Sequence, residues 1–360
     1  MAFSPNDPSQ AAEAGPGQGS ARPTALRRYW ASFASFLERN EKILWWLHSA
    51  YALLLGILVM WLGTRNFSFL RVVIFDIAFI WISSLFLPAV AGSGYLRPRW
   101  EARVRPVVNY FNKNFYQQLL FFVLPTYVSS ATYGSGNMLF VALLAASAVL
   151  STLDIVYDRY VSVRWPLSAV FFAFNLFACI NVMLPVLWSV SNYWALWISG
   201  ALALAGFASI LYGGSGRTGP SRWATVGMAA VALAGLIFFL RQYIPPAPLS
   251  IVRAEFGNSI RALSISEPLR ALPPPGTGKI VALTAIKAPL GLYEKVRHVW
   301  YLDGKVLYSS PYYPVTGGRE EGYRIWTQIT WNNSVKGQSL VLDVQTRGGQ
   351  LIGRARLERN

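Results

Sequence analysis

A series of apolar segments between residues 43 and 241 is the feature that most limits how this chain can fold. Each segment is close to the ~20 residues that an α-helix needs to cross the hydrocarbon core of a bilayer. The whole chain is 54% hydrophobic and only 13% charged, whereas a soluble globular protein carries about a quarter charged residues. The sequence therefore predicts a polytopic α-helical membrane bundle. We expect seven spans, at 43–62, 69–90, 114–132, 137–156, 166–189, 192–212 and 223–241.

The apolar part of the chain is flanked by segments of different composition. Residues 1–25 are rich in Pro, Ser, Gly, Ala and Gln and are expected to form a disordered tail. Residues 26–42 mix basic and aromatic side chains, which predicts an interfacial segment ahead of the transmembrane bundle at 43–241. The Pro-rich residues 242–250 are expected to form a stiff linker. Residues 251–360 are enough for one small extracytoplasmic domain.

Short runs of β-forming residues, separated by turn signals, predict that this last domain is all-β. Asp303-Gly304 lies between two such runs and is a strong hairpin signal. Many short strands at this spacing predict an immunoglobulin-like sandwich. The expected strands are 251–256, 259–265, 279–286, 295–302, 305–309, 323–330, 340–346 and 350–357.

The distribution of basic residues predicts how the chain is oriented. With seven spans, the N-terminal segment and the even-numbered loops carry fourteen Lys and Arg residues, whereas the odd-numbered loops carry two. The positive-inside rule then places the N-terminus in the cytoplasm. Seven spans place the C-terminal domain on the other side, which in a Gram-negative bacterium is the periplasm. We therefore expect a multi-pass protein of the inner membrane.

Two of the predicted strands carry a candidate binding face. Side chains alternate along a strand, so His298 and Trp300 share one face of 295–302, and Arg324 and Trp326 share one face of 323–330. If these strands pair in register, the four side chains and Arg319 form one patch. The alternative is that the tryptophans belong to the core and the arginine covers them.

Ionisable residues within the apolar runs form a second candidate site. Asp76 lies inside the second predicted span, Asp154 lies near the end of the fourth, and His48 lies near the start of the first. Ionisable groups in a bilayer are costly and often functional. This intramembrane polar site would indicate a transporter or a lipid-modifying protein. Alternatively, Asp76 pairs with a neighbour such as Arg71, and the other two side chains reach the interface.

Other classes of function find little support in the residues. One cysteine and two histidines cannot supply a disulfide framework or a Cys/His metal site, and no complete catalytic motif is present. We therefore expect no catalytic residues, metal or cofactor. The net charge of +16 lies largely in loops beside apolar runs, which argues for membrane orientation rather than nucleic-acid binding. Residues 251–360 carry 15 Lys and Arg against 8 Asp and Glu, which favours an anionic envelope polymer or lipid head group.

Several short motifs in the C-terminal region carry a family resemblance. They are His298-x-Trp300, Asp303-Gly304, Gly317-Gly318-Arg319, Gly322-Tyr323-Arg324 and Gly348-Gly349-Gln350-Leu351-Ile352-Gly353-Arg354. With them, residues from about 280 to 357 resemble the bacterial domain-of-unknown-function family 2914, and the apolar region is similar to family 5924. The resemblance implies a membrane-attached β domain and transfers no activity. The first hypothesis is an inner-membrane protein whose periplasmic domain binds an envelope component or a partner protein.

Overall fold

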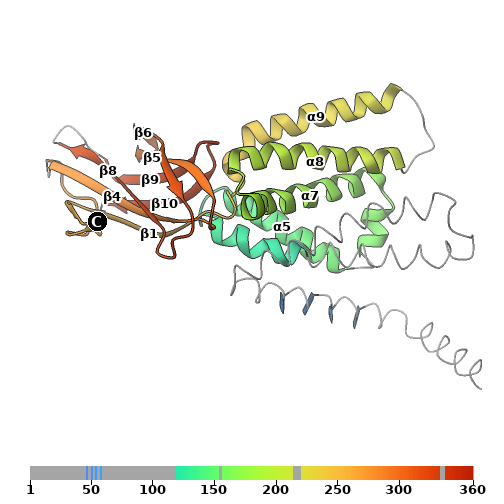
Figure 1. Cartoon of the computed structure of the whole chain (residues 1–360), viewed down its shortest axis with the longest axis horizontal. Coiled ribbons are helices and arrows are strands. Elements are labelled where there is room, and N and C mark those ends of the chain that lie inside the picture. The colour runs from blue at the N-terminus through green and yellow to red at the C-terminus, as the bar shows by residue number, and fades with distance from the viewer. Residues whose placement is uncertain are drawn as a thin grey trace, which may run out of the picture. The chain divides into compact units, whose positions relative to one another are not determined.

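The computed structural model describes residues 119–153, 156–213, 220–276, 278–332 and 337–359, with scattered residues between 46 and 58. Packing divides the chain after Leu47, and the second unit runs from His48 to Asn360. Within this second unit a helical segment ends at Tyr243 and a β-rich segment begins at Ser250 (Figure 1).

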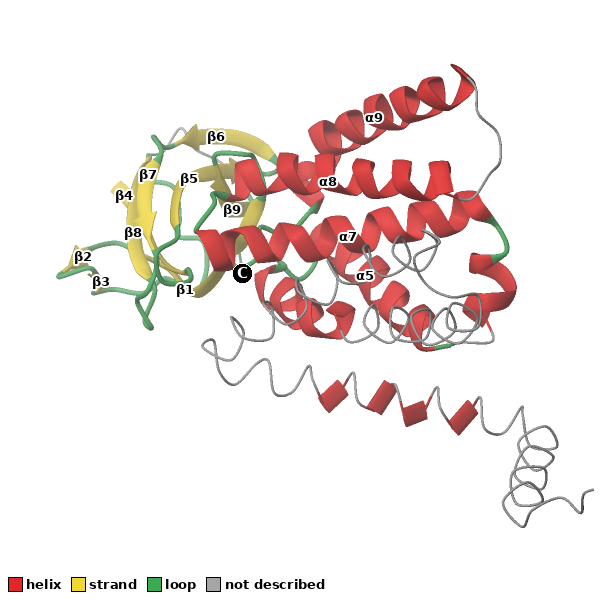
Figure 2. Ribbon diagram, turned by 45° about the vertical axis from the view of Figure 1, so that its right-hand side comes forward, coloured by secondary structure: helices red, strands yellow, loops and turns green. Residues whose placement is uncertain are grey.

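The helical segment is built from long apolar helices joined by short connections. A helix at Leu119–Ser130 precedes α5 (Asn137–Thr152), the π-helix η1 (Tyr157–Ser162), α7 (Trp165–Trp188), α8 (Asn192–Gly213), α9 (Pro220–Leu240) and the 3₁₀ turn η2 (Arg241–Tyr243). Pro166 occupies the first turn of α7, where its missing N–H costs nothing. Ser189 ends α7 in the left-handed conformation, with φ 54°. This sharp stop lets α8 run back beside α7, as both views show (Figures 1 and 2).

The prediction of seven membrane spans is wrong. Among the described residues, two helices are long and apolar enough to cross a membrane, Pro166–Trp188 and Trp223–Tyr243. The helix α5 has 16 residues, about 24 Å at 1.5 Å per residue, which is short of the ~30 Å hydrocarbon core. Its apolar side chains Val141 and Leu144 are buried against other helices instead. The predicted span 69–90 lies outside the described residues, as does most of 43–62.

The β-rich segment contains two main antiparallel sheets and a small hairpin. The three-stranded sheet has the order β1-β4-β8, and the five-stranded sheet has the order β10-β9-β5-β6 with β7 also paired to β5. The hairpin joins β2 to β3. The strands are β1 (Ser250–Gly257), β2 (Ile260–Arg261), β3 (Ser264–Ile265), β4 (Gly278–Lys287), β5 (Tyr293–Leu302), β6 (Lys305–Ser309), β7 (Tyr313–Thr316), β8 (Tyr323–Trp331), β9 (Ser339–Thr346) and β10 (Leu351–Glu358).

The prediction of an immunoglobulin-like sandwich is corrected to a β-rich domain with two main sheets and a hairpin. The expected strand 259–265 is in fact the hairpin of β2 and β3, and β7 was not predicted. Runs of β-forming residues locate strands but carry no information on which strands pair. The Asp303-Gly304 hairpin is confirmed, because β5 and β6 pair across it and both turn residues have positive φ, 47° and 81°.

Side chains from both main sheets share the same apolar clusters. In one cluster, Ile280 and Trp331 of the three-stranded sheet lie with Trp300 and Leu342 of the five-stranded sheet. A second cluster is nearer the helices and includes Ile286, Val296 and Val344. The domain is therefore held together by burial between its sheets.

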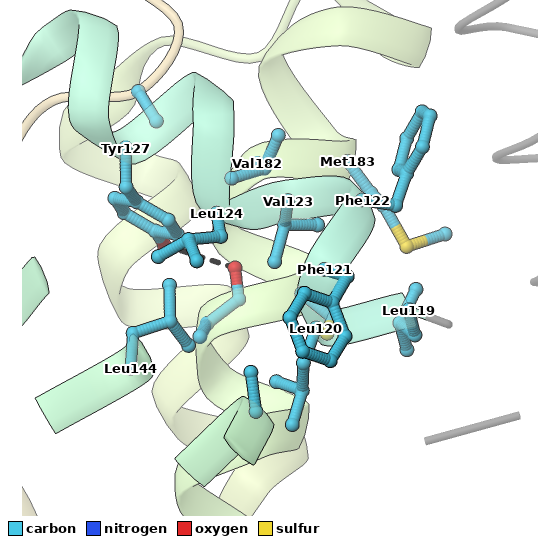
Figure 3. Close-up of a cluster of buried hydrophobic side chains, with 14 of the residues drawn as sticks. Leu119, Leu120, Phe121, Phe122, Val123, Leu124, Tyr127, Leu144, Val182 and Met183 are labelled. Atoms are coloured by element: carbon cyan, nitrogen blue, oxygen red, sulfur yellow. Dashed lines mark hydrogen bonds between the residues drawn. The ribbon is translucent and has the colours of Figure 1, made fainter. Parts of the chain in front are cut away.

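The helices have an apolar core of their own. Tyr127, Leu144 and Val182 lie in it, and the Tyr127 hydroxyl donates to the carbonyl oxygen of Ala178 at 2.9 Å (Figure 3). This hydrogen bond satisfies a buried hydroxyl, which would otherwise cost free energy.

Residues 242–250, expected to be a stiff linker, are largely a buried packing element. The side chains from Ile244 to Leu249 are all buried. Ala247 belongs to the helical core and Leu249 belongs to the β-domain cluster that contains Ile286. The connection therefore joins the two cores instead of spacing them apart.

Replacing Gly317 by alanine should destabilise the β domain by about 2 kcal/mol or more. A Cβ atom at Gly317 would collide with the backbone carbonyl of Pro289, and backbone cannot move aside as a flexible side chain can. Gly348→Ala is the matched control, because a Cβ there would meet only ordinary contacts at 3.6 Å. Thermal unfolding of the detergent-solubilised protein measures both variants. Equal melting temperatures for the two would contradict the prediction.

Candidate functional site

The five residues of the predicted binding face do not lie together. His298 and Trp300 are in β5 of the five-stranded sheet, whereas Arg324 and Trp326 are in β8 of the three-stranded sheet. His298 and Trp300 are fully buried at 0% exposure, whereas Trp326 is 41% exposed. Arg319 is exposed in the loop before β8. Alternation correctly places Arg324 and Trp326 on the same face of β8, but this is the outer face. The core-facing side carries the odd-numbered residues such as Ile325 and Thr327.

The alternative, in which the tryptophans belong to the core, is therefore correct for Trp300 and wrong for Trp326. Trp300 packs in the core, with the ring of Phe256 at a centroid distance of 5.8 Å. Trp326 projects from the outer face of the three-stranded sheet. On the same face, Arg324 pairs with Glu321 at 2.7 Å and reaches the carbonyl of Leu263 at 3.4 Å. Arg319 instead lies over the ring of Tyr323 at 4.9 Å.

A hydrogen-bonded network surrounds His298 between the two sheets. Its Nε2 atom lies 2.8 Å from the Thr284 hydroxyl on β4, and its Nδ1 atom lies 2.8 Å from the Thr327 hydroxyl on β8. The Thr327 hydroxyl also accepts from Trp300 Nε1 at 3.0 Å. In either neutral tautomer, one threonine donates to the ring and the other accepts from it.

This arrangement holds the imidazole in its neutral form. Burial lowers the pKa of His298 to about 4, because desolvation penalises the charged ring. No carboxylate contacts the ring among the described residues to offset this effect. The His298 network is thus a structural tie between the sheets and is poorly placed to exchange protons with a ligand.

The three residues of the predicted intramembrane site, Asp76, Asp154 and His48, lie outside the described residues. Within the part of the chain that is described, no group of three or more His, Cys, Asp or Glu side chains is placed to hold a metal ion.

A second buried polar cluster lies where the helices meet the β domain, and we call it the junction. Glu294, at the start of β5, is 3% exposed. Its Oε2 atom accepts from the backbone N–H of Asn192 at 2.7 Å and from Asn192 Nδ2 at 3.3 Å. Its Oε1 atom accepts from the backbone of Lys295 at 3.0 Å. Since Asn192 begins α8, the carboxylate caps the positive end of that helix.

The electrostatics of Glu294 reflect two opposing effects. Burial raises the pKa of its carboxyl, while the N–H donors of Asn192 and Lys295 act to lower it. The hydrogen bonds from Asn192 and Lys295 therefore offset part of the desolvation penalty of the carboxylate.

Two further amides complete the junction. Asn137, at the start of α5, donates from Nδ2 to the carbonyl oxygen of Leu351 at 3.0 Å. Gln350 donates from Nε2 to the carbonyl oxygen of Ile244 at 3.2 Å. Asn137, Asn192 and Gln350 are 0% exposed, and Glu294 is 3% exposed. Polar contacts from three helix ends thus converge on the β domain.

Sequence reasoning did not find the junction. One signal was present, because alternation along β5 places Glu294 on the same core-facing side as Val296 and His298. A carboxylate at such a position must find buried donors. Its partner Asn192 could not be identified, because it lies 102 residues earlier in the chain.

Protonation of His298 should weaken the β domain as the pH falls. The folded-state pKa of about 4 lies below the ordinary value of 6.5, so below pH 6.5 the unfolded chain takes up a proton that the folded chain refuses. The loss of stability begins near pH 6.5 and reaches about 3 kcal/mol near pH 4. His298→Gln lacks this titration and serves as the reference. The wild-type advantage in unfolding free energy should shrink between pH 7 and pH 4.5, and a constant difference would refute the assignment.

Removing the Glu294 carboxylate should loosen the junction. Glu294→Ala leaves the buried N–H groups of Asn192 without an acceptor, which costs about 1–3 kcal/mol. Glu294→Gln keeps one acceptor oxygen and should cost less. The measurements are the melting temperature in detergent and the rate at which protease releases the β domain. Wild-type behaviour of the alanine variant in both would show that the junction does not hold the domain.

Comparison with known families accounts for both parts of the chain. The model of the "Protein of unknown function (DUF2914)" family matches residues 293–358, and that of the "Family of unknown function (DUF5924)" matches residues 26–266. No curated protein and no solved structure gave a match. Both resemblances expected from the sequence are confirmed, in the expected order. Since the second match spans more than half of the 360 residues, the chain belongs to the DUF5924 family of unknown function.

Proposed function

We propose that this chain is a protein of the bacterial inner membrane that holds its β domain in the periplasm, with its N-terminus in the cytoplasm. The domain binds an envelope component or a partner protein through an exposed sheet face, and the helices fix the position of that face. The observation that carries this proposal is the junction, which attaches the β domain directly to the helix ends.

The exposure of α9 supports a membrane location. Only 6% of the apolar stretch of α9 is buried within the protein, against 56% for α7. Its side chains Val231 and Phe239 are 76% and 72% exposed. The core helix of a soluble protein would be covered by protein, whereas an apolar helix facing lipid would not be. The helix also lies far from the N-terminus, unlike a signal sequence.

The arginines between helices support the orientation without any count of spans. The helix ends that meet the β domain are the starts of α5 and α8 and the end of α9. The connections on that side, 131–136, 189–191 and 241–249, carry one basic residue, Arg241. The connections at the opposite ends contain Arg159, Arg164 and Arg217. By the positive-inside rule the opposite ends face the cytoplasm and the β domain faces outward.

The buried junction supports a role in presentation. A flexible tether would let the domain search a volume around the membrane, whereas the buried segment from Ile244 to Leu249 holds it against the helices. A face held in one orientation binds its partner at a lower cost in conformational entropy. His298, the histidine of this domain, is buried in its network, which favours binding over acid–base chemistry.

Cysteine labelling tests the proposed orientation. The chain has a single cysteine, Cys179, which is buried, so the wild type gives the unlabelled baseline. Gln328→Cys places a thiol on the exposed face of β8. Val163→Cys places one between α5 and α7, where the native side chain is 75% exposed. A membrane-impermeant maleimide is then applied to spheroplasts before and after permeabilisation.

We expect Gln328→Cys to react in intact spheroplasts and Val163→Cys to react only after permeabilisation. The opposite pattern would place the β domain in the cytoplasm and overturn the proposal. Melting temperatures of both variants close to that of the wild type would show that the label reports position rather than unfolding.

A further inference from the structure

Arg297 projects from β5 onto the outer face of the five-stranded sheet and is held there without an acidic partner. Its guanidinium lies over the ring of Tyr312 at 5.3 Å. Its Nη2 atom donates to Gln345 Oε1 on β9 at 3.3 Å. Other arginines of the domain, such as Arg253 and Arg354, form ion pairs with carboxylates. No described carboxylate lies within ion-pair distance of Arg297.

The side chains around Arg297 form a polar row across the sheet. Gln345 Nε2 donates to the Tyr301 hydroxyl at 3.4 Å. Beyond it, Arg354 makes a two-point contact with Asp343, with N–O distances of 2.6 and 2.8 Å. Register pairs Arg297 with Gln345 and Asp343 with Arg354. These contacts fix the side chains before any ligand arrives, so little rotamer freedom is lost on binding.

The guanidinium has donors that remain unused. Arginine carries five N–H donors in a rigid fork, and among the described residues this guanidinium has one hydrogen-bond partner, Gln345, which Nη2 contacts. The Nε atom is shielded from solvent and has no acceptor in the described part of the chain. Because Nε is shielded, an anion arriving from solvent would contact the outer nitrogens Nη1 and Nη2. The arrangement is that of a cation prepared for an anion.

We propose that Arg297, Tyr312 and Gln345 form a binding site for the carboxylate of an acidic polysaccharide. This inference rests on the proposed function, because it takes the outward-facing β domain to be the binding part. It names the ligand class. It also places the site on the outer face of the five-stranded sheet, and not on the predicted face that included Trp326.

The charge and hydrogen-bonding groups of the row complement a carboxylate. Arg354 is neutralised by Asp343, whereas Arg297 has no acidic partner among the described residues, and the exposed Lys295 lies on the same side of β5. One guanidinium complements the one negative charge of a carboxylate, with two parallel hydrogen bonds. The row also offers the Tyr301 hydroxyl and the Gln345 amide to sugar hydroxyls, and it runs across three adjacent strands, which suits an extended polymer.

Binding of oligogalacturonate to the purified full-length protein in neutral detergent tests this site by calorimetry. Arg297→Gln should weaken binding about tenfold or more, because it removes a charge-assisted contact. Tyr312→Ser, which removes the ring beneath the guanidinium, should weaken it about threefold. Arg253→Gln, on the three-stranded sheet, removes the same charge and should bind as the wild type does. Melting temperatures establish that each variant is folded.

Three results with oligogalacturonate would overturn the inference. They are no binding by the wild type, equal binding by Arg297→Gln and the wild type, or a loss in Arg324→Gln as large as that in Arg297→Gln. Tighter binding to phosphatidylglycerol vesicles than to oligogalacturonate would also overturn it in favour of a lipid head group. None of these outcomes depends on the labelling pattern of Gln328→Cys, so this site can fail while the proposed orientation stands, and the reverse.

Discussion

A buried carboxylate at the first amide of a helix holds the two parts of this protein together. Glu294 would be costly to bury alone, and α8 would begin with unsatisfied N–H groups. Their contact at 2.7 Å gives the carboxylate a donor and satisfies the backbone N–H of Asn192. Around it, Asn137 and Gln350 form further hydrogen bonds, and Leu249 and Ala247 fill the adjoining cores. The position of the β domain, and so the direction in which its faces point, depends on this junction.

The family boundaries do not coincide with the boundaries of the fold. The first match ends at residue 266, just after β3, and the second begins at residue 293, at the start of β5. Between them lies β4, which pairs with β1 on one side and with β8 on the other. The three-stranded sheet is therefore built from both matched regions and the segment between them. A fragment cut at either boundary would expose the edges of β4 and lose part of its core.

The sequence predicted local features well and long-range features poorly. Alternation and turn chemistry located most strands and the Asp303-Gly304 hairpin, because these depend on neighbouring residues. Pairing was not accessible, so His298 and Arg324 were placed on one face although they lie in different sheets. Apolar length was read as membrane crossing, but in α5 part of it serves helix packing. Neither Glu294 nor Arg297 carries a motif, because each is defined by partners distant in the chain.

The His298 network has a consequence for how the two sheets align. The ring nitrogens face different strands, and each needs a hydroxyl at 2.8 Å, from Thr284 on β4 and from Thr327 on β8. Apolar contacts tolerate a sheet that slides by one residue pair, but the imidazole would then meet alkyl groups on both sides. The network thus disfavours a shifted alignment of the two sheets, in which the imidazole would lose both hydroxyl partners. A single alignment of the two sheets keeps both hydrogen bonds of the imidazole.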